Sequence, residues 1–269
     1  MTPVISVVMP TLNEEKYVER TLNCLRNQKT SIPYEIVVCD SYSIDKTVQI
    51  AKKYADKIVF EPKKGIAYGR NTGVKNSSGK YIINVDADTY YPNDFIQKAY
   101  KVFKQEKYVG FFCGHWDLYD GRSVWWKKIL CIIIGRFIFS LVLSYMNLRN
   151  TLLFAGWSLC TPRWVFDKVG GFSTNPCVVE DAQYALDIEH LGLKTYIPNI
   201  KVRSSVRRFT KGIKDSIKHY SKLKFTFNDL FYYITRKSRY PFNKIFGINE
   251  PDFYILISLF ALINIALIL

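Results

Sequence analysis

The chain has 269 residues, of which 48% are hydrophobic and 23% are charged, and this balance excludes both a disordered chain and a coiled coil. Lys and Arg together number 38 against 23 Asp and Glu, so the formal net charge is +15. Such an excess favours an anionic partner: a phosphate group, a nucleic acid or an acidic membrane surface.

The six cysteines are spread along the chain and none forms a C-x-x-C pair, so neither a zinc ribbon nor a dithiol redox site is expected. Several lie in apolar runs, where a thiol packs as a small hydrophobic side chain. We therefore expect reduced cysteines and an intracellular protein. We expect no signal peptide, because an apolar, strand-like run begins at Val4.

The first 110 residues alternate between strand-like and helix-like patterns. Short apolar runs predict strands at 5–9, 34–39, 57–60 and 80–85. Short apolar strands between helices imply a mostly parallel sheet that is covered on both faces. Ligands of such sheets bind at the carboxyl ends of the strands. The sequence thus predicts an α/β fold whose functional residues follow the strands.

An apolar stretch in the middle of the chain, ILCIIIGRFIFSLVLSYM at 129–146, contains one charged residue, Arg136. A charge at the centre of a bilayer is costly, so we interpret the stretch as an interfacial or core helix rather than a spanning one. Helical spacing of apolar residues returns from Glu180 to Leu191.

The end of the chain changes character. Residues 207–244 are rich in Lys, Arg and aromatic residues, and the 17 residues of 253–269 carry no charge. As a helix, that last stretch would span about 25 Å, slightly less than the ~30 Å hydrocarbon core of a bilayer. It predicts a membrane segment, with a buried C-terminal helix as the alternative. The basic run before it predicts an anionic membrane surface as a partner and the α/β domain on the cytoplasmic side.

Two carboxylates, Asp86 and Asp88, flank Ala87 directly after the predicted strand at 80–85. Carboxylates at i and i+2 can project toward one hard cation, and Mg²⁺ and Mn²⁺ take oxygen ligands and commonly bridge to substrate phosphates. The alternative is a solvated acidic turn. The position after an apolar strand favours a metal site.

Polar residues also follow the first two strands. The segment Pro10-Thr11-Leu12-Asn13-Glu14 opens a helix, where backbone amides and short polar side chains suit a nucleotide or a phosphate. Plain N-capping by Thr11 or Asn13 is the alternative. Asp40 lies at the end of the second strand, where capping explains it less well.

Three further segments have both a functional and a structural interpretation. The Gly-rich run at 65–73 contains Arg70, which can pair with a phosphate, or it is a turn that leads into a helix. Glu180 and Asp181 begin a helix, as a general base or as an acidic first turn. The pair Arg207-Arg208 can neutralise a diphosphate leaving group or face anionic lipid.

Taken together and in order, these segments resemble family-2 glycosyltransferases with a GT-A fold. The resemblance covers about residues 4–210, and the matching pieces are VVMPTLNEE (7–15), VVCDSYSIDKT (37–47), G-x-x-x-x-R-N-x-G (65–73), VDADTYYP (85–92), FDKVGGF (166–172) and ED (180–181). It implies an inverting transfer from a nucleotide-activated sugar. SVRRF at 205–209 stands where processive synthases of the family have Q-x-x-R-W, which predicts transfer of a single sugar.

The resemblance also implies roles for individual residues. The base and ribose of a UDP- or GDP-sugar would be held by the residues after the first two strands, and the phosphates by arginines. The implied donor-binding residues are Pro10, Thr11, Asn13, Glu14, Asp40, Arg70, Asp86, Ala87, Arg207 and Arg208. Asp88 would ligate Mn²⁺ or Mg²⁺, with Asp86 on the ribose or on a metal-bound water. Asp181 would be the base that deprotonates the acceptor, with Glu180 beside it.

We expect three parts: a Rossmann-like GT-A catalytic domain at 1–210, basic interfacial helices at 211–252 and a membrane-anchoring segment at 253–269. The expected reaction moves a sugar to a hydroxyl of a lipid-linked or glycolipid acceptor, since a phosphate acceptor needs little help from a base. A polyprenyl-phosphate glycosyltransferase and a catalytically dead, membrane-tethered sugar-nucleotide binder are the alternatives. A nucleic-acid partner is not expected, because the basic residues concentrate beside the apolar tail.

Overall fold

The computed structural model describes residues 2–105, 109–113, 115–118, 158–174, 180–189, 191–196 and 198–205. All of them lie in one of the two compact units of the chain, which is made of Met1–Tyr119, Tyr145–Asn175 and Glu180–Ser205. The apolar stretch 129–146, Arg207, Arg208 and the predicted segments 211–252 and 253–269 lie outside the described residues. Within the described part of the chain, no helix is long and apolar enough to cross a membrane.

Strands and helices alternate through the first hundred residues, as predicted. In chain order the elements are β1 (Ile5–Thr11), α1 (Val18–Arg26), β2 (Tyr34–Asp40), α2 (Thr47–Ala51), β3 (Lys57–Phe60), α3 (Ile66–Lys75), β4 (Tyr81–Val85), β5 (Thr89–Tyr90) and α4 (Phe95–Gln105). They are followed by β6 (Val109–Cys113), β7 (His115–Leu118), β8 (Ser158–Pro162), α6 (Arg163–Val169), α7 (Glu180–Glu189), β9 (Lys194–Tyr196) and β10 (Lys201–Ser204).

The main sheet has seven strands in the order β3-β2-β1-β4-β8-β6-β9, and a smaller sheet has the order β5-β10-β7. In the main sheet β1 runs parallel to β2 and β4, and β2 runs parallel to β3. β8 is antiparallel to both of its neighbours. The predicted α/β fold with a mostly parallel sheet is therefore confirmed. The carboxyl ends of β1, β2 and β4 meet at one edge.

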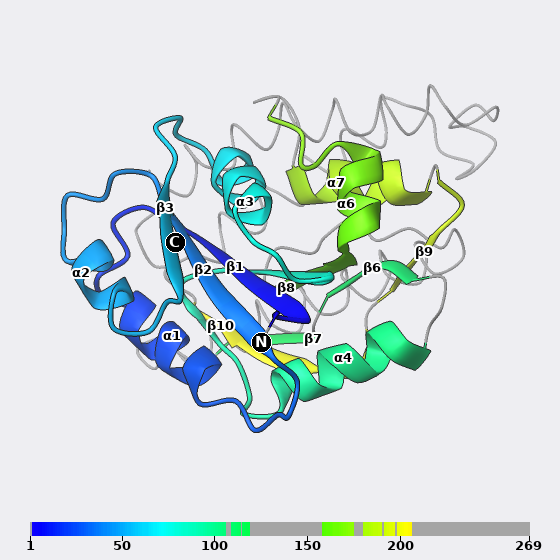
Figure 1. Cartoon of the computed structure of the whole chain (residues 1–269), viewed down its shortest axis with the longest axis horizontal. Coiled ribbons are helices and arrows are strands. Elements are labelled where there is room, and N and C mark those ends of the chain that lie inside the picture. Colours follow the sequence, from blue (N-terminus) through cyan, green and yellow to red (C-terminus); the bar gives the residue numbers. More distant parts are fainter. Residues whose placement is uncertain are drawn as a thin grey trace, which may run out of the picture. The chain divides into compact units, whose positions relative to one another are not determined.

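Helices cover both faces of the main sheet, with α3, α6 and α7 on one side and α1 and α4 on the other (Figure 1). On the α1 side, Ile5, Val7 and Met9 of β1 pack in the largest core cluster. α1 supplies its buried stripe of Val18, Leu22 and Leu25, whose spacing matches one helical face.

The opposite face of β1 lies directly beneath α3. A Cβ atom on Gly73 would come within 2.4 Å of Val8 Cγ1, and one on Gly69 within 2.9 Å of the Pro10 Cβ. The glycines of the 65–73 run are therefore needed so that helix and strand can approach. The interpretation of this run as a turn that leads into a helix is wrong for residues 66–73, which lie within α3 itself.

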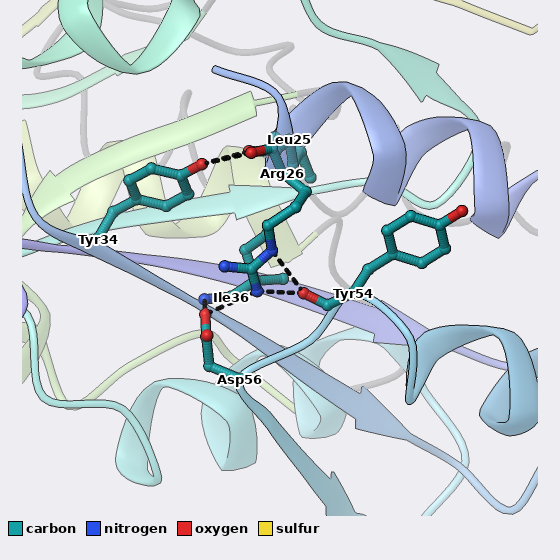
Figure 2. Close-up of polar contacts among 6 residues, drawn as sticks. All are labelled: Leu25, Arg26, Tyr34, Ile36, Tyr54 and Asp56. Atoms are coloured by element: carbon teal, nitrogen blue, oxygen red, sulfur yellow. Dashed lines mark hydrogen bonds and ion pairs between the residues drawn. The ribbon is translucent and has the colours of Figure 1, made fainter. Parts of the chain in front are cut away.

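Away from the carboxyl ends of the strands, side chains tie the end of α1 to the turn before β3 (Figure 2). Arg26 donates to the Tyr54 carbonyl and, at 2.9 Å, to the Asp56 carboxylate. Asp56 Oδ2 also accepts the Ile36 amide of β2 at 2.7 Å, and the Tyr34 hydroxyl donates to the Leu25 carbonyl. This network fixes α1 against β2 and leaves the opposite end of β2 for the site.

Candidate functional site

The loops after β1 and β2 are joined through one buried carboxylate, Asp40. Its Oδ2 accepts the Thr11 hydroxyl at 2.8 Å and the Ser43 hydroxyl at 2.6 Å, and its Oδ1 accepts the Ser43 amide at 2.7 Å. Asp40 is fully buried and Thr11 is 4% exposed. The two residues also face each other as the last register pair of β1 and β2. The structure thus brings together two of the residues that follow the predicted strands, Thr11 and Asp40.

Further hydrogen bonds join the loop after β1 to the loop after β2. The amides of Asn13 and Glu14 donate to the hydroxyls of Ser43 and Thr47, at 2.8 and 2.7 Å. The Asn13 side chain accepts the Ile44 amide at 3.0 Å. The capping interpretation of Thr11 and Asn13 is wrong, because α1 begins only at Val18 and no side chain caps it. These polar groups instead build a rigid two-loop platform.

The turn after β4 is buried rather than solvated. Asp86 is 8% exposed and Asp88 4%, so the interpretation as a solvated acidic turn is wrong. Backbone contacts hold the turn: the Thr21 hydroxyl donates to the Ala87 carbonyl at 2.7 Å, and the Ser205 amide to the Asp88 carbonyl at 3.2 Å. Burying two carboxylates is costly unless cations or hydrogen bonds compensate, which is the environment of a cation site.

Arg70 of α3 reaches this turn from the other face of the sheet. Its Nη2 lies 3.3 Å from Asp86 Oδ1, and its Nη1 lies 2.9 Å from Glu180 Oε1. The guanidinium also lies over the Phe172 ring, 5.4 Å from its centroid. Burial acts to lower the pKa of Arg70, but the carboxylates, Glu180 first, outweigh it and raise that pKa.

α7 brings the second acidic pair to the same place. Glu180 and Asp181 begin the helix, where the free backbone amides favour negative charge. Asp181 is 8% exposed, and its charge contributes to the raised pKa of Arg70, so it lies within electrostatic reach of that guanidinium. The structure thus gathers Arg70, Asp86, Glu180 and Asp181 into one cluster.

The predicted metal ligands fit a divalent cation in their chemistry. Asp86 and Asp88 supply only oxygen atoms, which Mg²⁺ and Mn²⁺ prefer. Among the described residues, no group of three or more His, Cys, Asp or Glu side chains is arranged to hold a metal. Mg²⁺ usually takes only one or two carboxylates and completes its shell with waters and substrate phosphates, so two carboxylates are sufficient.

Other residues of the site had been given no role from the sequence. Ser43 and Thr47 anchor the platform, and their only sequence signal was their place in the loop after Asp40. Asn71 uses both ends of its amide on Phe172: its Nδ2 donates to the carbonyl, and its Oδ1 accepts the amide, each at 2.8 Å. Asn71 and Phe172 both lie in segments of the family resemblance, but no local sequence pattern predicted that they pair.

Comparison with known proteins agrees with this geometry. The family model for "Glycosyl transferase family 2" matches residues 6–166, more than half of the chain. A protein of Methanococcus voltae, dolichyl N-acetyl-alpha-D-glucosaminyl phosphate 3-beta-D-2,3-diacetamido-2,3-dideoxy-beta-D-glucuronosyltransferase, is 33% identical over 230 residues. That alignment covers 77% of this chain and 70% of the relative. Poly(ribitol-phosphate) beta-N-acetylglucosaminyltransferase TarS of Staphylococcus aureus is 34% identical, over 35% of this chain and 18% of TarS.

Solved structures show the same fold. Mannosyltransferase PcManGT from Pyrobaculum calidifontis, in complex with GDP-Man and Mn²⁺, matches with a TM-score of 0.63 at 21% identity, over 90% of this chain and 66% of that one. S. aureus TarS 1-349 in complex with UDP-GlcNAc matches with a TM-score of 0.58 at 17% identity, over 84% of this chain and 65% of that one. From the family match and the M. voltae relative, the chain belongs to glycosyl transferase family 2 and is a glycosyltransferase with a GT-A fold.

Proposed function

We propose that the protein is an inverting glycosyltransferase that moves one sugar from a nucleotide-sugar donor to a hydroxyl of a lipid-linked acceptor, with Mn²⁺ or Mg²⁺ as cofactor. One observation carries the proposal. A single buried guanidinium, that of Arg70, contacts both Asp86 of the turn after β4 and Glu180 at the start of α7. One arginine therefore contacts Asp86, one of the two proposed metal ligands, and Glu180, the neighbour of the proposed base.

The two-loop platform is the proposed binding site for the nucleoside of the donor. It consists of Pro10, Thr11, Asn13 and Glu14 after β1, together with Asp40 after β2. An ionised carboxylate has about four lone-pair positions, and Asp40 uses three of them within the protein. Because Asp40 is also fully buried, its proposed role is to hold the platform, whose more exposed residues Asn13 and Glu14 would contact the base or ribose of a UDP- or GDP-sugar.

Asp88 and Asp86 would hold the cation. A divalent cation bound there supplies positive charge next to the leaving diphosphate, where negative charge grows during transfer. Arg207 and Arg208 are proposed as further partners of that diphosphate.

Asp181 is the proposed general base. Its neighbour Glu180 is ion-paired with Arg70 at 2.9 Å, so that carboxylate is already engaged within the protein. Asp181 takes the proton of the acceptor hydroxyl as that oxygen attacks the anomeric carbon. The bond from this carbon to the diphosphate breaks in the same displacement, the nucleoside diphosphate leaves, and the configuration inverts.

The acceptor class rests on two supports. An acidic pair in which Asp181 is buried suits a hydroxyl, which must lose a proton, better than a phosphate, which is already ionised. The M. voltae relative is named for transfer to a dolichyl-linked N-acetylglucosaminyl phosphate. The basic run at 207–244 and the apolar run at 253–269 support an anionic membrane surface as a partner, with the catalytic domain on its cytoplasmic side.

The test compares wild type, Asp181→Asn and Asp187→Asn on two acceptors, a polyprenyl-linked sugar and a polyprenyl phosphate, with UDP- and GDP-sugars and Mn²⁺. Asp187 is on the same helix and is only partly buried, so it serves as the matched control. We expect transfer to the linked sugar, lost by about 100-fold or more in Asp181→Asn alone. An unchanged rate in Asp181→Asn would exclude it as the base.

The same assay separates the alternatives. Transfer to polyprenyl phosphate alone would show the phosphate-acceptor activity instead. Donor binding without transfer or donor hydrolysis, with either cation present, would show a non-catalytic sugar-nucleotide binder.

A further inference from the structure

We infer that Arg70 is a positioning residue, which ties the Asp86–Asp88 turn to the first turn of α7 and does not itself bind the donor. The consequence for catalysis rests on the proposed function, whereas the tie itself does not. The family resemblance placed this arginine on the nucleotide or its phosphates, so the two roles make opposite predictions for nucleotide binding.

The guanidinium is buried inside the protein. The Arg70 side chain is 1% exposed, and it is the largest of the fully buried side chains in the described part of the chain. Two of its nitrogens contact carboxylates of the protein, and one of its sides lies against the Phe172 ring. A side chain covered in this way has little surface to offer to a phosphate.

The helix that carries Arg70 packs closely on the sheet. Gly69 and Gly73 bring α3 into close contact with Pro10 and Val8 of β1, and the helix therefore has one fixed height above the sheet. From this height Arg70 reaches a residue 16 positions away and another 110 positions away in the sequence. The arginine thus joins the turn after β4 to the start of α7, two segments that are far apart in the sequence.

The neighbouring residue makes a second connection to the same region. Asn71 binds the backbone of Phe172 at both its amide and its carbonyl, and Phe172 is the residue whose ring covers the Arg70 guanidinium. The fit at the adjacent Gly171 is tight, because a Cβ there would lie 2.7 Å from Asn71 Oδ1. Arg70 and Asn71 together therefore fix α3 to the segment that leads into α7.

Electrostatics explains why the tie needs an arginine. Asp86, Asp88 and Asp181 are buried, and the Glu180 side chain is 20% exposed. As neighbouring carboxylates they would repel one another without a cation between them. A lysine would keep the charge, but its single ammonium is a point charge, whereas the planar guanidinium presents donors on separate nitrogens to two partners. Arg70→Lys therefore keeps the positive charge but loses the simultaneous contact with Asp86 and Glu180, and Arg70→Met removes both the charge and the contact.

The test uses the full chain with Arg70→Lys, Arg70→Met and a matched control, Arg163→Lys. Arg163 also binds several partners through its guanidinium, with hydrogen bonds to Gly79, Val74 and Ser77, but it lies outside the site. Binding of UDP and GDP is measured by calorimetry without metal. Binding of Mn²⁺ without nucleotide is measured from the paramagnetic resonance of the free ion. Hydrogen exchange in residues 180–189 follows α7 directly.

We expect metal-free nucleotide affinity to stay within about twofold in Arg70→Lys, since no direct contact is lost. Exchange in α7 should rise in both Arg70 variants and not in Arg163→Lys. Mn²⁺ should bind about tenfold more tightly to Arg70→Met, because a repelling cation beside Asp86 is gone. The kcat of Arg70→Lys should fall about 100-fold with little change in the KM for donor, as expected for a misplaced catalytic group.

A loss of tenfold or more in metal-free nucleotide affinity would overturn the inference, since it would mean a direct contact with the donor. So would unchanged α7 exchange in Arg70→Lys. If Arg70→Met does not fold, the cycle of Arg70→Lys with Glu180→Gln replaces it, and additive effects on α7 exchange would contradict a bridge. If the wild type transfers no sugar, the proposed function fails, while the exchange, nucleotide and Mn²⁺ measurements still decide the role of Arg70.

Discussion

Thr11 and Asp40 end the neighbouring strands β1 and β2, and the Thr11 hydroxyl donates a 2.8 Å hydrogen bond to Oδ2 of Asp40. The same carboxylate accepts the amide and the hydroxyl of Ser43, so all three of these protein contacts are donors to Asp40. A carboxylate has enough acceptor positions for all three contacts, so one side chain joins both loops. The residue thus builds the platform to which the donor nucleoside is proposed to bind.

Replacing Asp40 with Asn should therefore reduce both stability and nucleotide binding. The amide keeps the shape but directs an N–H₂ group at one of the three donors, and the charge is lost. We expect the free energy of unfolding to fall by about 2 kcal/mol, the scale of hydrogen bonds to a charged group. Nucleotide affinity should fall at least about tenfold. Urea denaturation and calorimetric titration with UDP and GDP measure the two effects.

Asp56→Asn is the matched control for this prediction. Asp56 also accepts a backbone amide of β2, that of Ile36, but it does so near the other end of the strand and pairs there with Arg26 (Figure 2). This variant should lose stability and keep its nucleotide affinity. Unaltered nucleotide affinity in Asp40→Asn would remove Asp40 from the donor site.

A second prediction concerns the cation. Asp88→Ala removes a carboxylate that is 4% exposed, and it should abolish transfer together with its dependence on Mn²⁺ or Mg²⁺. A ligand that binds the folded state raises the unfolding midpoint, so the rise produced by Mn²⁺ with nucleotide should also disappear. Asp94→Ala, which removes an exposed partner of Lys98, should keep both properties. Near-normal turnover of Asp88→Ala in the presence of a chelator would rule out the metal assignment.

Sequence reasoning found the edge of the sheet where these residues meet, and the reason is physical. Alternating apolar strands and helices force a parallel sheet, and parallel strands direct their carboxyl ends to one edge. The residues that follow each strand, Thr11, Asp40 and Asp86, could therefore be assigned to one site before the structure was known. The buried face of α1 was equally predictable, because its period is local.

The pairings across that edge could not be predicted. Local sequence suggested capping for Thr11 and Asn13, whereas the nearest partners lie about thirty positions away, in the loop after β2. Arg70 meets Glu180 across 110 positions, and no periodicity encodes such a contact. The glycines around Arg70 suggested a turn that leads into a helix, but their missing side chains serve the packing of α3 on β1.

A third prediction concerns pH and the thiol of Cys39, which is fully buried on β2. Burial, with the charges of Glu61 and Asp40, raises the pKa of this thiol from 9.0 to about 12. The unfolded chain therefore releases this proton near pH 9, while the folded chain keeps it until about pH 12. Stability from this group is present below pH 9 and is lost as the pH rises, by up to about 1.4 kcal/mol per pH unit.

Comparison with Cys39→Ala isolates the effect of that thiol from all other groups that titrate at high pH. The difference in unfolding free energy between wild type and variant should shrink as the pH rises from 9.0 toward about 12, in urea denaturation at each pH. A difference that does not change with pH would mean that Cys39 ionises in the folded protein as readily as in the unfolded one.

The last prediction concerns Asn84, a polar residue in the middle of the sheet. It is fully buried on β4 between Val8 of β1 and Leu159 of β8, and its side-chain amide has no hydrogen-bond partner among the residues that the structure describes. A buried polar group without a partner costs about 1–3 kcal/mol. Asn84→Leu, which has a similar branched shape, should therefore raise the free energy of unfolding by about 1 kcal/mol, after a small cost for its larger volume.

Asn71→Leu is the control, because Asn71 uses both ends of its amide on Phe172 and its loss should destabilise the protein. Urea denaturation of both variants measures the effect, and a loss of stability in Asn84→Leu as large as in Asn71→Leu would show that the Asn84 amide binds a polar partner in solution.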